Sequence, residues 1–252
     1  MMRNAAPEYR WNTSLAAEAF DAAAEYIHPF YLEIQDQILA QLQLPSEVRA
    51  VVVDLGGGSG RLIERILTRF PSARAILVDQ SEPFLALAER RLQPFGSRAR
   101  LIKRRLQDDW AADMPDAAQA IVSMSAIHHL DPAEKRALFQ RCYNALATGG
   151  VFLNGDEIRP ESDAEYRDQL EWWVADKNSA TERGLIPASF APVFEAWYDR
   201  NVRRFGEPKH SGDDCHETIA AQSAYLRGAG FAEIKIAWQT KLWAVLEGSK
   251  PR

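Results

Sequence analysis

The stretch from Ala50 to Phe70 carries residue types that could bind a nucleotide-like ligand. It begins with three consecutive valines and Asp54, continues with glycines at positions 56, 57, 58 and 60, and then places apolar residues at helical spacing. A β-branched run bounded by glycines is typical of a strand that is buried on both faces. Glycines let a ligand approach the backbone closely, and the first N–H groups of the following helix lack intrahelical partners. The stretch therefore predicts a ligand-binding loop between a buried strand and a helix.

The spacing of these glycines excludes two common nucleotide-binding patterns. In a G-x-G-x-x-G motif counted from Gly56, the third glycine would fall on Arg61, and no Gly-Lys-Ser/Thr follows as a P-loop requires. The pattern that fits is D-x-G-x-G-x-G from Asp54 to Gly60, with a second acid, Asp79, at the end of the next apolar run. That carboxylate suits a ribose, because two adjacent hydroxyls can both donate to it.

This pattern resembles that of the class I S-adenosylmethionine (SAM)-dependent methyltransferases. The resemblance implies SAM as the cofactor and S-adenosylhomocysteine as the product. It implies that Asp79 binds the ribose, that Asp108 or Asp109 accepts from the adenine amino group, and that Trp110 covers the adenine face. A solvated loop acid is the alternative for either aspartate, and an unrelated nucleotide binder is the alternative for the whole pattern. The cofactor residues implied in this way are Asp54, Gly56, Gly58, Gly60, Asp79, Gln80, Asp108, Asp109, Trp110 and Met124.

Strand-like and helix-like segments alternate after the glycine loop, which is typical of a doubly wound parallel sheet. The last two strand-like runs are joined by only three residues, so they must pair antiparallel. We therefore predict an α/β fold, with a mostly parallel seven-stranded sheet, a terminal antiparallel hairpin, N-terminal helices that end at Pro45 and Ser46, and a helical cap insertion. The chain is expected to form one domain, divided into an N-terminal helical lid at 1–45, a Rossmann-like core at 46–155 and 216–250, and the cap at 156–215.

Two adjacent histidines follow the fourth predicted strand, 120–124, where an open α/β sheet places its ligands. The pKa of imidazole lies near neutrality, so His128 or His129 could act as the general base that takes a proton from an acceptor. The alternative is structural, with one ring hydrogen-bonded to the fold and the other lining the pocket.

The cap is rich in aromatic residues, which are candidates for contact with an acceptor. The alternative for each is ordinary packing of the cap against the sheet edge. The His, Asp, Cys and Glu residues at 210–217 lack the paired spacing of metal ligands, so we expect no metal site and expect Asp213 or Asp214 to cap the next helix. The predicted substrate-side residues are Asp156, Trp172, Trp173, Trp197, Arg204 and His216.

Further segments are similar to the carboxy-SAM synthase branch of the same fold, namely Pro29-Phe30-Tyr31, 130–138, and Glu217-Thr218 with Gly230-Phe231. That branch makes carboxy-SAM from prephenate for modification of the tRNA wobble uridine. The resemblance implies that Tyr31 touches the cofactor and that Arg204, with Arg203 beside it, binds the extra carboxylate in a homodimer. An arginine fork suits a carboxylate because it can bind it bidentately. The glycine loop here differs from the Gly-Cys-Ser-x-Gly of that branch, so carboxy-SAM synthesis is the alternative activity.

Composition narrows the class of protein. The net charge of −5 argues against a dedicated nucleic-acid surface, and no run approaches the ~18 apolar residues of a membrane span. Two scattered cysteines and the lack of an N-terminal apolar run indicate a reducing, cytoplasmic location. We expect an enzyme that methylates a small, aromatic or amphipathic molecule, without direct nucleic-acid or membrane partners. A non-catalytic SAM-binding regulator is the alternative from another class.

Overall fold

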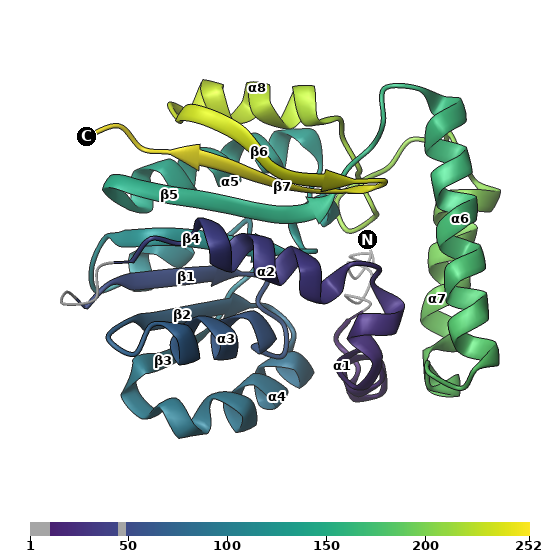
Figure 1. Cartoon of the computed structure of the whole chain (residues 1–252), viewed down its shortest axis with the longest axis horizontal. Coiled ribbons are helices and arrows are strands. Elements are labelled where there is room, and N and C mark those ends of the chain that lie inside the picture. The colour runs from purple at the N-terminus through teal and green to yellow at the C-terminus, as the bar shows by residue number, and fades with distance from the viewer. Residues whose placement is uncertain (1–10, 45–48) are drawn as a thin grey trace, which may run out of the picture.

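The computed structural model describes residues 11–44 and 49–252, which form a seven-stranded sheet with helices on both faces (Figure 1). The strand order is β3-β2-β1-β4-β5-β7-β6, with β7 antiparallel to both neighbours. The predicted α/β fold with a terminal hairpin is therefore confirmed. The strands are β1 (Val51–Leu55), β2 (Arg74–Asp79), β3 (Ala99–Lys103), β4 (Ala118–Met124), β5 (Leu146–Glu157), β6 (Ala232–Thr240) and β7 (Trp243–Ser249).

Two apolar layers enclose the sheet, and side chains alternate between them along each strand. In β1, Val52 joins the layer that includes α2 (Tyr31–Gln41), α3 (Arg61–Arg69) and α4 (Glu82–Leu92). Its neighbours Val51 and Val53 join the opposite layer, with α5 and α8. Burial on both faces explains why the strand consists of consecutive valines. Helices α5 and α8 span Pro132–Ala145 and Ile219–Ala229.

Three helices stand beyond the carboxyl ends of the parallel strands. Figure 1 shows α6 (Asp163–Glu182) and α7 (Ala191–Tyr198) side by side at this end, with α1 (Ser14–Ile27) between them and the sheet. The Trp173 ring lies 4.6 Å from that of Trp197 and 4.8 Å from that of Trp243 on β7, centre to centre. These contacts join α6, α7 and the terminal hairpin in one apolar cluster.

Some expected element boundaries were wrong. The fifth strand, β5, pairs with β7 along 151–157. Residues 148–150 also lie within β5. Helix α8 is capped by the Thr218 hydroxyl and not by Asp213 or Asp214. The expected helix end at Pro45 and Ser46 lies outside the described residues.

Within 11–44 and 49–252, no helix combines the length and the apolar character that crossing a bilayer would require.

Candidate active site

A cavity of about 660 Å³ lies where the carboxyl ends of the parallel strands meet the cap. Its lining comes from several separate parts of the chain, at the edge where an open α/β sheet binds its ligands. The N-terminal part contributes Trp11, Phe20 and Tyr31, the loop after β1 contributes Gly56, Gly57 and Gly58, and the cap contributes Trp173, Lys177, Phe194 and Trp197.

The glycine loop is packed too tightly for a side chain at Gly56 and at Gly57. Gly56 has φ +69°, and a Cβ at this position would lie 2.3 Å from the Cβ of Ala126. A Cβ on Gly57 would lie 2.6 Å from Leu77 Cγ and 2.7 Å from Asp54 Oδ2. Glycine is thus required here both for backbone conformation and for space.

Asp79 is fixed at the end of β2 by the loops around it. The Gly58 N–H donates to its Oδ2 at 2.9 Å, and the Ser81 N–H donates to its Oδ1 at 2.8 Å. The carboxylate thereby ties the glycine loop to the start of α4 while it lines the cavity. Each oxygen has further acceptor capacity for a ligand hydroxyl.

Asp54 is a buried carboxyl group without a partner. Neither of its side-chain oxygens has a hydrogen-bond partner among the described residues, and the residue lines the cavity. Burial, together with the charge of Asp79, raises the pKa of Asp54 to about 8. Leaving a buried carboxyl unpaired is costly unless a ligand compensates it. SAM carries both an ammonium and a sulfonium group, so this residue fits the cofactor that the glycine pattern implies.

Helix α1 is fastened over the glycine loop by one acid. Asp21 accepts hydrogen bonds from the Ser59 hydroxyl at 2.6 Å, from Arg61 Nε at 3.0 Å and from both terminal nitrogens of Arg91 at 3.1 Å. Ser59 and Arg61 belong to the loop and the first turn of α3, and Arg91 belongs to α4. Asp21 therefore connects α1 to the two helices that follow the loop.

The opposite side of the cavity holds a cluster of buried ionisable residues, which we call the polar cluster. The His128 N–H and its ring Nδ1 lie 2.9 and 2.7 Å from the two oxygens of Asp156. His216 Nε2 lies 2.7 Å from Glu157 Oε2, and its Nδ1 lies 2.6 Å from the Tyr166 hydroxyl. The polar cluster consists of His128, His129, Asp156, Glu157, Tyr166, Asp214 and His216.

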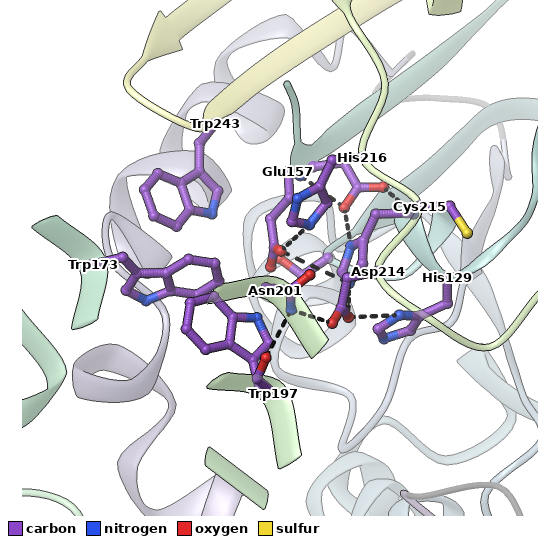
Figure 2. A network of polar contacts seen from close by, with 12 residues as sticks. His129, Glu157, Trp173, Trp197, Asn201, Asp214, Cys215, His216 and Trp243 are labelled. Carbon is purple, nitrogen blue, oxygen red and sulfur yellow. Dashed lines mark hydrogen bonds and ion pairs between the residues drawn. The ribbon is translucent and has the colours of Figure 1, made fainter. Parts of the chain in front are cut away.

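Asp214 joins this cluster from the loop that precedes α8. Its Oδ1 lies 3.4 Å from His129 Nδ1 and 3.7 Å from His128 Nε2, and its Oδ2 accepts from the Asn201 amide at 2.7 Å. Figure 2 shows Asp214 between Asn201 and His129, with Glu157 and His216 beside it. Segments distant in sequence are thus held together by charge and hydrogen bonds.

The carboxylates of the polar cluster control the protonation of His128. Burial alone would lower the pKa of His128, but Glu157, Asp156 and Asp214 together raise it to about 9. In return, His128 and His216 hold the pKa of Glu157 well below its usual range despite its burial. At neutral pH in the absence of other cations, His128 therefore keeps its proton and is a weak base.

Lys177 on α6 places an ammonium group inside an aromatic box. Its Nζ lies 4.4, 4.6 and 4.8 Å from the ring centres of Trp173, Trp197 and Phe194. Burial lowers the pKa of Lys177 to about 8. A cation over aromatic faces is stabilised in part, but it retains most of the cost of lost hydration.

More than half of the predicted site residues line this cavity. These are Tyr31, Asp54, Gly56, Gly58, Asp79, Gln80, Met124, His128, His129, Trp173 and Trp197. The predicted residues that are not in its lining are Gly60, Asp108, Asp109, Trp110, Asp156, Trp172, Arg204 and His216.

The residues outside the lining have other surroundings. Trp110 is fully buried in the apolar layer that contains α5 and α8. Trp172 stacks on Phe30, with ring centres 6.1 Å apart. Arg204 pairs with Asp199 at 2.8 Å on a partly exposed surface. Asp156 and His216 lie one step behind the lining, where they hold His128 and Glu157.

The cavity residues that were missed in the sequence include Glu157, Lys177 and Asp214. Glu157 follows Asp156 at the carboxyl end of β5, where an open α/β sheet places ligand-binding residues. Lys177 follows Trp173 by four positions and so shares its helix face. The positions of Glu157 and Lys177 in the sequence could therefore have identified them as candidate site residues.

Known proteins resemble this chain in sequence and fold. Residues 52–150 match a family described as a methyltransferase domain. A trans-aconitate 2-methyltransferase of Variovorax paradoxus is 35% identical over 115 residues, which are 46% of this chain and 40% of that protein. A carboxy-SAM synthase of Helicobacter pylori is 23% identical over 191 residues, covering 69% of this chain and 78% of that protein.

The fold is also found among solved structures. Human N-acetylserotonin methyltransferase in complex with SAM superposes with a TM-score of 0.57 at 14% identity, covering 94% of this chain and 59% of that one. The matched part of this chain thus spans 40% of the trans-aconitate 2-methyltransferase, 78% of the carboxy-SAM synthase and 59% of the N-acetylserotonin methyltransferase. With the glycine loop and the sheet order described above, the match over residues 52–150 identifies a methyltransferase domain of the class I SAM-dependent type, whose cofactor is SAM.

Proposed function

We propose that this chain transfers the methyl group of SAM to a small acceptor that binds between the glycine loop and the cap. The observation that carries the proposal is the buried Asp54, whose oxygens have no partner among the described residues, beside a loop with no space for a side chain at Gly56 and Gly57. In this assignment Asp54 faces the ammonium of the cofactor, and Asp79 binds the ribose hydroxyls. Methyl transfer from a sulfonium is an in-line displacement, so the protein contributes mainly by positioning and by excluding water.

The lining of the cap side favours an acceptor with a flat apolar body and one acidic group. Trp173, Trp197 and Phe194 supply broad apolar faces, and Lys177 supplies a cation within the same wall. An acceptor that enters as an anion needs no general base, which agrees with the raised pKa of His128. Transfer to a carboxylate, phenolate or enolate is therefore the form of the reaction that we favour.

The first test is to denature freshly purified protein and determine the mass of any nucleoside that it releases. SAM or S-adenosylhomocysteine is expected. SAM binding is then measured by calorimetry for wild type, Asp79→Ala and Asp109→Ala. Removing Asp79 takes away ribose contacts and two loop hydrogen bonds, so we expect affinity to fall at least about 100-fold. Asp109, which is exposed outside the cavity, provides the matched control and should leave affinity unchanged.

The acceptor is tested by screening small aromatic and unsaturated carboxylic acids for conversion of SAM to S-adenosylhomocysteine. Turnover with at least one acid that is lost in Asp79→Ala supports the proposal. Failure of SAM to bind wild type at all would overturn it. Tight SAM binding without turnover on any class of small molecule would favour a regulatory SAM-binding protein.

Carboxy-SAM synthesis is the second candidate, favoured by the match that covers most of a carboxy-SAM synthase. It predicts release of a nucleoside heavier than SAM by one carboxylate. In this chain Arg204, the arginine implied for that carboxylate, pairs with Asp199 outside the cavity lining. The mass measurement separates the two candidates directly.

A further inference from the structure

Three metal-ligand atoms converge within the polar cluster. His128 Nε2, His216 Nε2 and Glu157 Oε2 all come from buried residues, and such ligand atoms lie within 4.8 Å of one another. Glu157 Oε2 is 2.7 Å from the His216 nitrogen and 3.9 Å from the His128 nitrogen. An ion with ligands at about 2.1 Å sets adjacent ligand atoms about 3 Å apart and opposite ones about 4.2 Å apart. The observed spacing fits such an ion with small adjustments.

Both imidazoles are oriented by partners on their other nitrogen. Asp156 lies 2.7 Å from His128 Nδ1, and the Tyr166 hydroxyl lies 2.6 Å from His216 Nδ1. These contacts turn the Nε2 atoms of the two rings toward Glu157. Metal-binding histidines are held in this way, with a carboxylate or another polar group fixing the tautomer and the ring direction.

The electrostatics of the cluster call for a cation at its centre. A carboxylate can only accept, so His128 Nδ1 carries the proton in its contact with Asp156, and a neutral ring then has a lone pair on Nε2. That Nε2 faces Glu157 Oε2 at 3.9 Å and Asp214 Oδ1 at 3.7 Å, which are both acceptors. These acceptors need positive charge between them, which protons on the two imidazoles supply in the free protein and a metal ion could supply in their place.

We propose that His128, His216 and Glu157 bind a divalent first-row transition-metal ion, with Asp214 at the edge of the site. Two imidazoles and one carboxylate favour ions such as Fe²⁺, Mn²⁺, Co²⁺ or Zn²⁺. The ligands come from the turn after β4, the end of β5 and the loop before α8. No local spacing in the sequence therefore predicts this set of ligands.

The site opens toward the cavity. His128, Glu157 and Asp214 belong to its lining, whereas His216 approaches from behind. Coordination positions on the cavity side would accept oxygen atoms of a carboxylate, enolate or phenolate. This consequence for the acceptor rests on the proposed methyl transfer, whereas the metal site itself does not.

The test is a titration of EDTA-dialysed, full-length protein with Co²⁺, followed by visible absorption and by metal analysis of the dialysed complex. Wild type should bind one Co²⁺ per chain and show the absorption of a protein-bound ion. Glu157→Gln should bind at least about 100-fold more weakly, because it removes an anionic ligand at nearly constant shape. Tyr166→Phe, which leaves the ligands intact but frees the His216 ring, should cost about tenfold.

His210→Gln is the matched control, because His210 is an exposed histidine in the loop that contains Asp214 and His216. It should bind Co²⁺ like wild type. Thermal melting and SAM binding of each variant show whether it is folded. Wild type that binds no Co²⁺, or Glu157→Gln that binds it as tightly as wild type, would overturn the proposal and leave a proton on His128 as the cation of the cluster.

The SAM titration is carried out in EDTA, so that the two proposals can fail separately. SAM binding without Co²⁺ binding contradicts only the metal site. Stoichiometric Co²⁺ binding without SAM binding contradicts only the proposed function.

Discussion

The two walls of the cavity are stabilised in opposite ways. The cofactor wall, Asp54 to Gly58 with Asp79, is mostly backbone, and added atoms would collide with Ala126, Leu77 or Asp54. The acceptor wall, formed by the polar cluster and Lys177, consists of buried ionisable side chains held by one another. Gly56 and Gly57 in the first wall therefore leave no space for a side chain, whereas the stability of the second wall depends on buried charge. Substitutions can test each half of this contrast.

The largest effect is expected from adding one methyl group to the cofactor wall. Gly56→Ala combines a positive φ with a Cβ 2.3 Å from the Ala126 Cβ, so we expect it to lower the free energy of unfolding by about 3 kcal/mol and to abolish SAM binding. Urea denaturation and calorimetry measure the two effects. Gly184→Ala, with φ +70° but nothing within 4 Å of the added Cβ, isolates the backbone cost of about 1–2 kcal/mol. Equal losses in both variants would show that the loop has room to adjust.

Removing a buried charge from the acceptor wall should raise the free energy of unfolding instead of lowering it. The pKa of Lys177 falls from 10.5 to about 8 on folding, so at pH 7 the folded protein carries the cost of a buried ammonium. Lys177→Met keeps the stem, and we expect it to raise the free energy of unfolding by about 2 kcal/mol at pH 7. Between about pH 8 and 10.5 the unfolded chain binds more protons, so wild-type stability rises with pH and the advantage of the variant shrinks.

Urea denaturation at pH 7 and pH 9.5 measures this effect. Lys241→Met is the control, since Lys241 also lies over a tryptophan but is exposed. A destabilised Lys177→Met would mean that the aromatic box stabilises the ammonium by more than its burial costs. The stability of the acceptor wall would then depend on side-chain packing, as that of the cofactor wall does.

Release of a proton on SAM binding should identify Asp54 in the cofactor wall. With a pKa of about 8, Asp54 is largely protonated in the free protein at pH 6, and pairing with the cofactor ammonium requires its ionised form. We expect SAM affinity to rise by up to about tenfold per pH unit from pH 6 to 8 and then to level off. Calorimetry across this range measures the slope. Asp54→Asn should bind SAM more weakly, and its affinity should not change with pH in this range. An equal pH dependence in wild type and variant would assign the titration to another group.

The smallest effect is expected outside both walls. Arg204→Ala removes an ion pair with Asp199 in which both side chains are largely exposed, and such pairs contribute at most about 1 kcal/mol. SAM affinity and the mass of the released nucleoside should not change. Loss of the bound nucleoside in this variant would favour carboxy-SAM chemistry and an arginine that acts across a subunit interface.

The same contrast explains which parts of the site could be predicted from the sequence. The cofactor wall is made by neighbouring residues, so the spacing of Asp54 and the glycines indicated both its position and its ligand. The acceptor wall is assembled from His128, Glu157, Lys177 and Asp214, which no local pattern connects. Contact between them depends on how α6 and the loop before α8 pack at the end of the sheet. The sequence predicted the sheet and the hairpin well, because strand periodicity and short connections are local properties.

The Asp21 contacts have a consequence for the timing of the reaction. One carboxylate joins α1 to the loop, α3 and α4, and α1 also lines the cavity. We expect release of a nucleoside bound beneath α1 to require that several charge-assisted hydrogen bonds break together, so that its residence time depends on the opening of the N-terminal helices. Spent cofactor would then be exchanged more slowly than methyl groups are transferred. One partly buried acid on α1 would in that case limit the rate of the whole cycle.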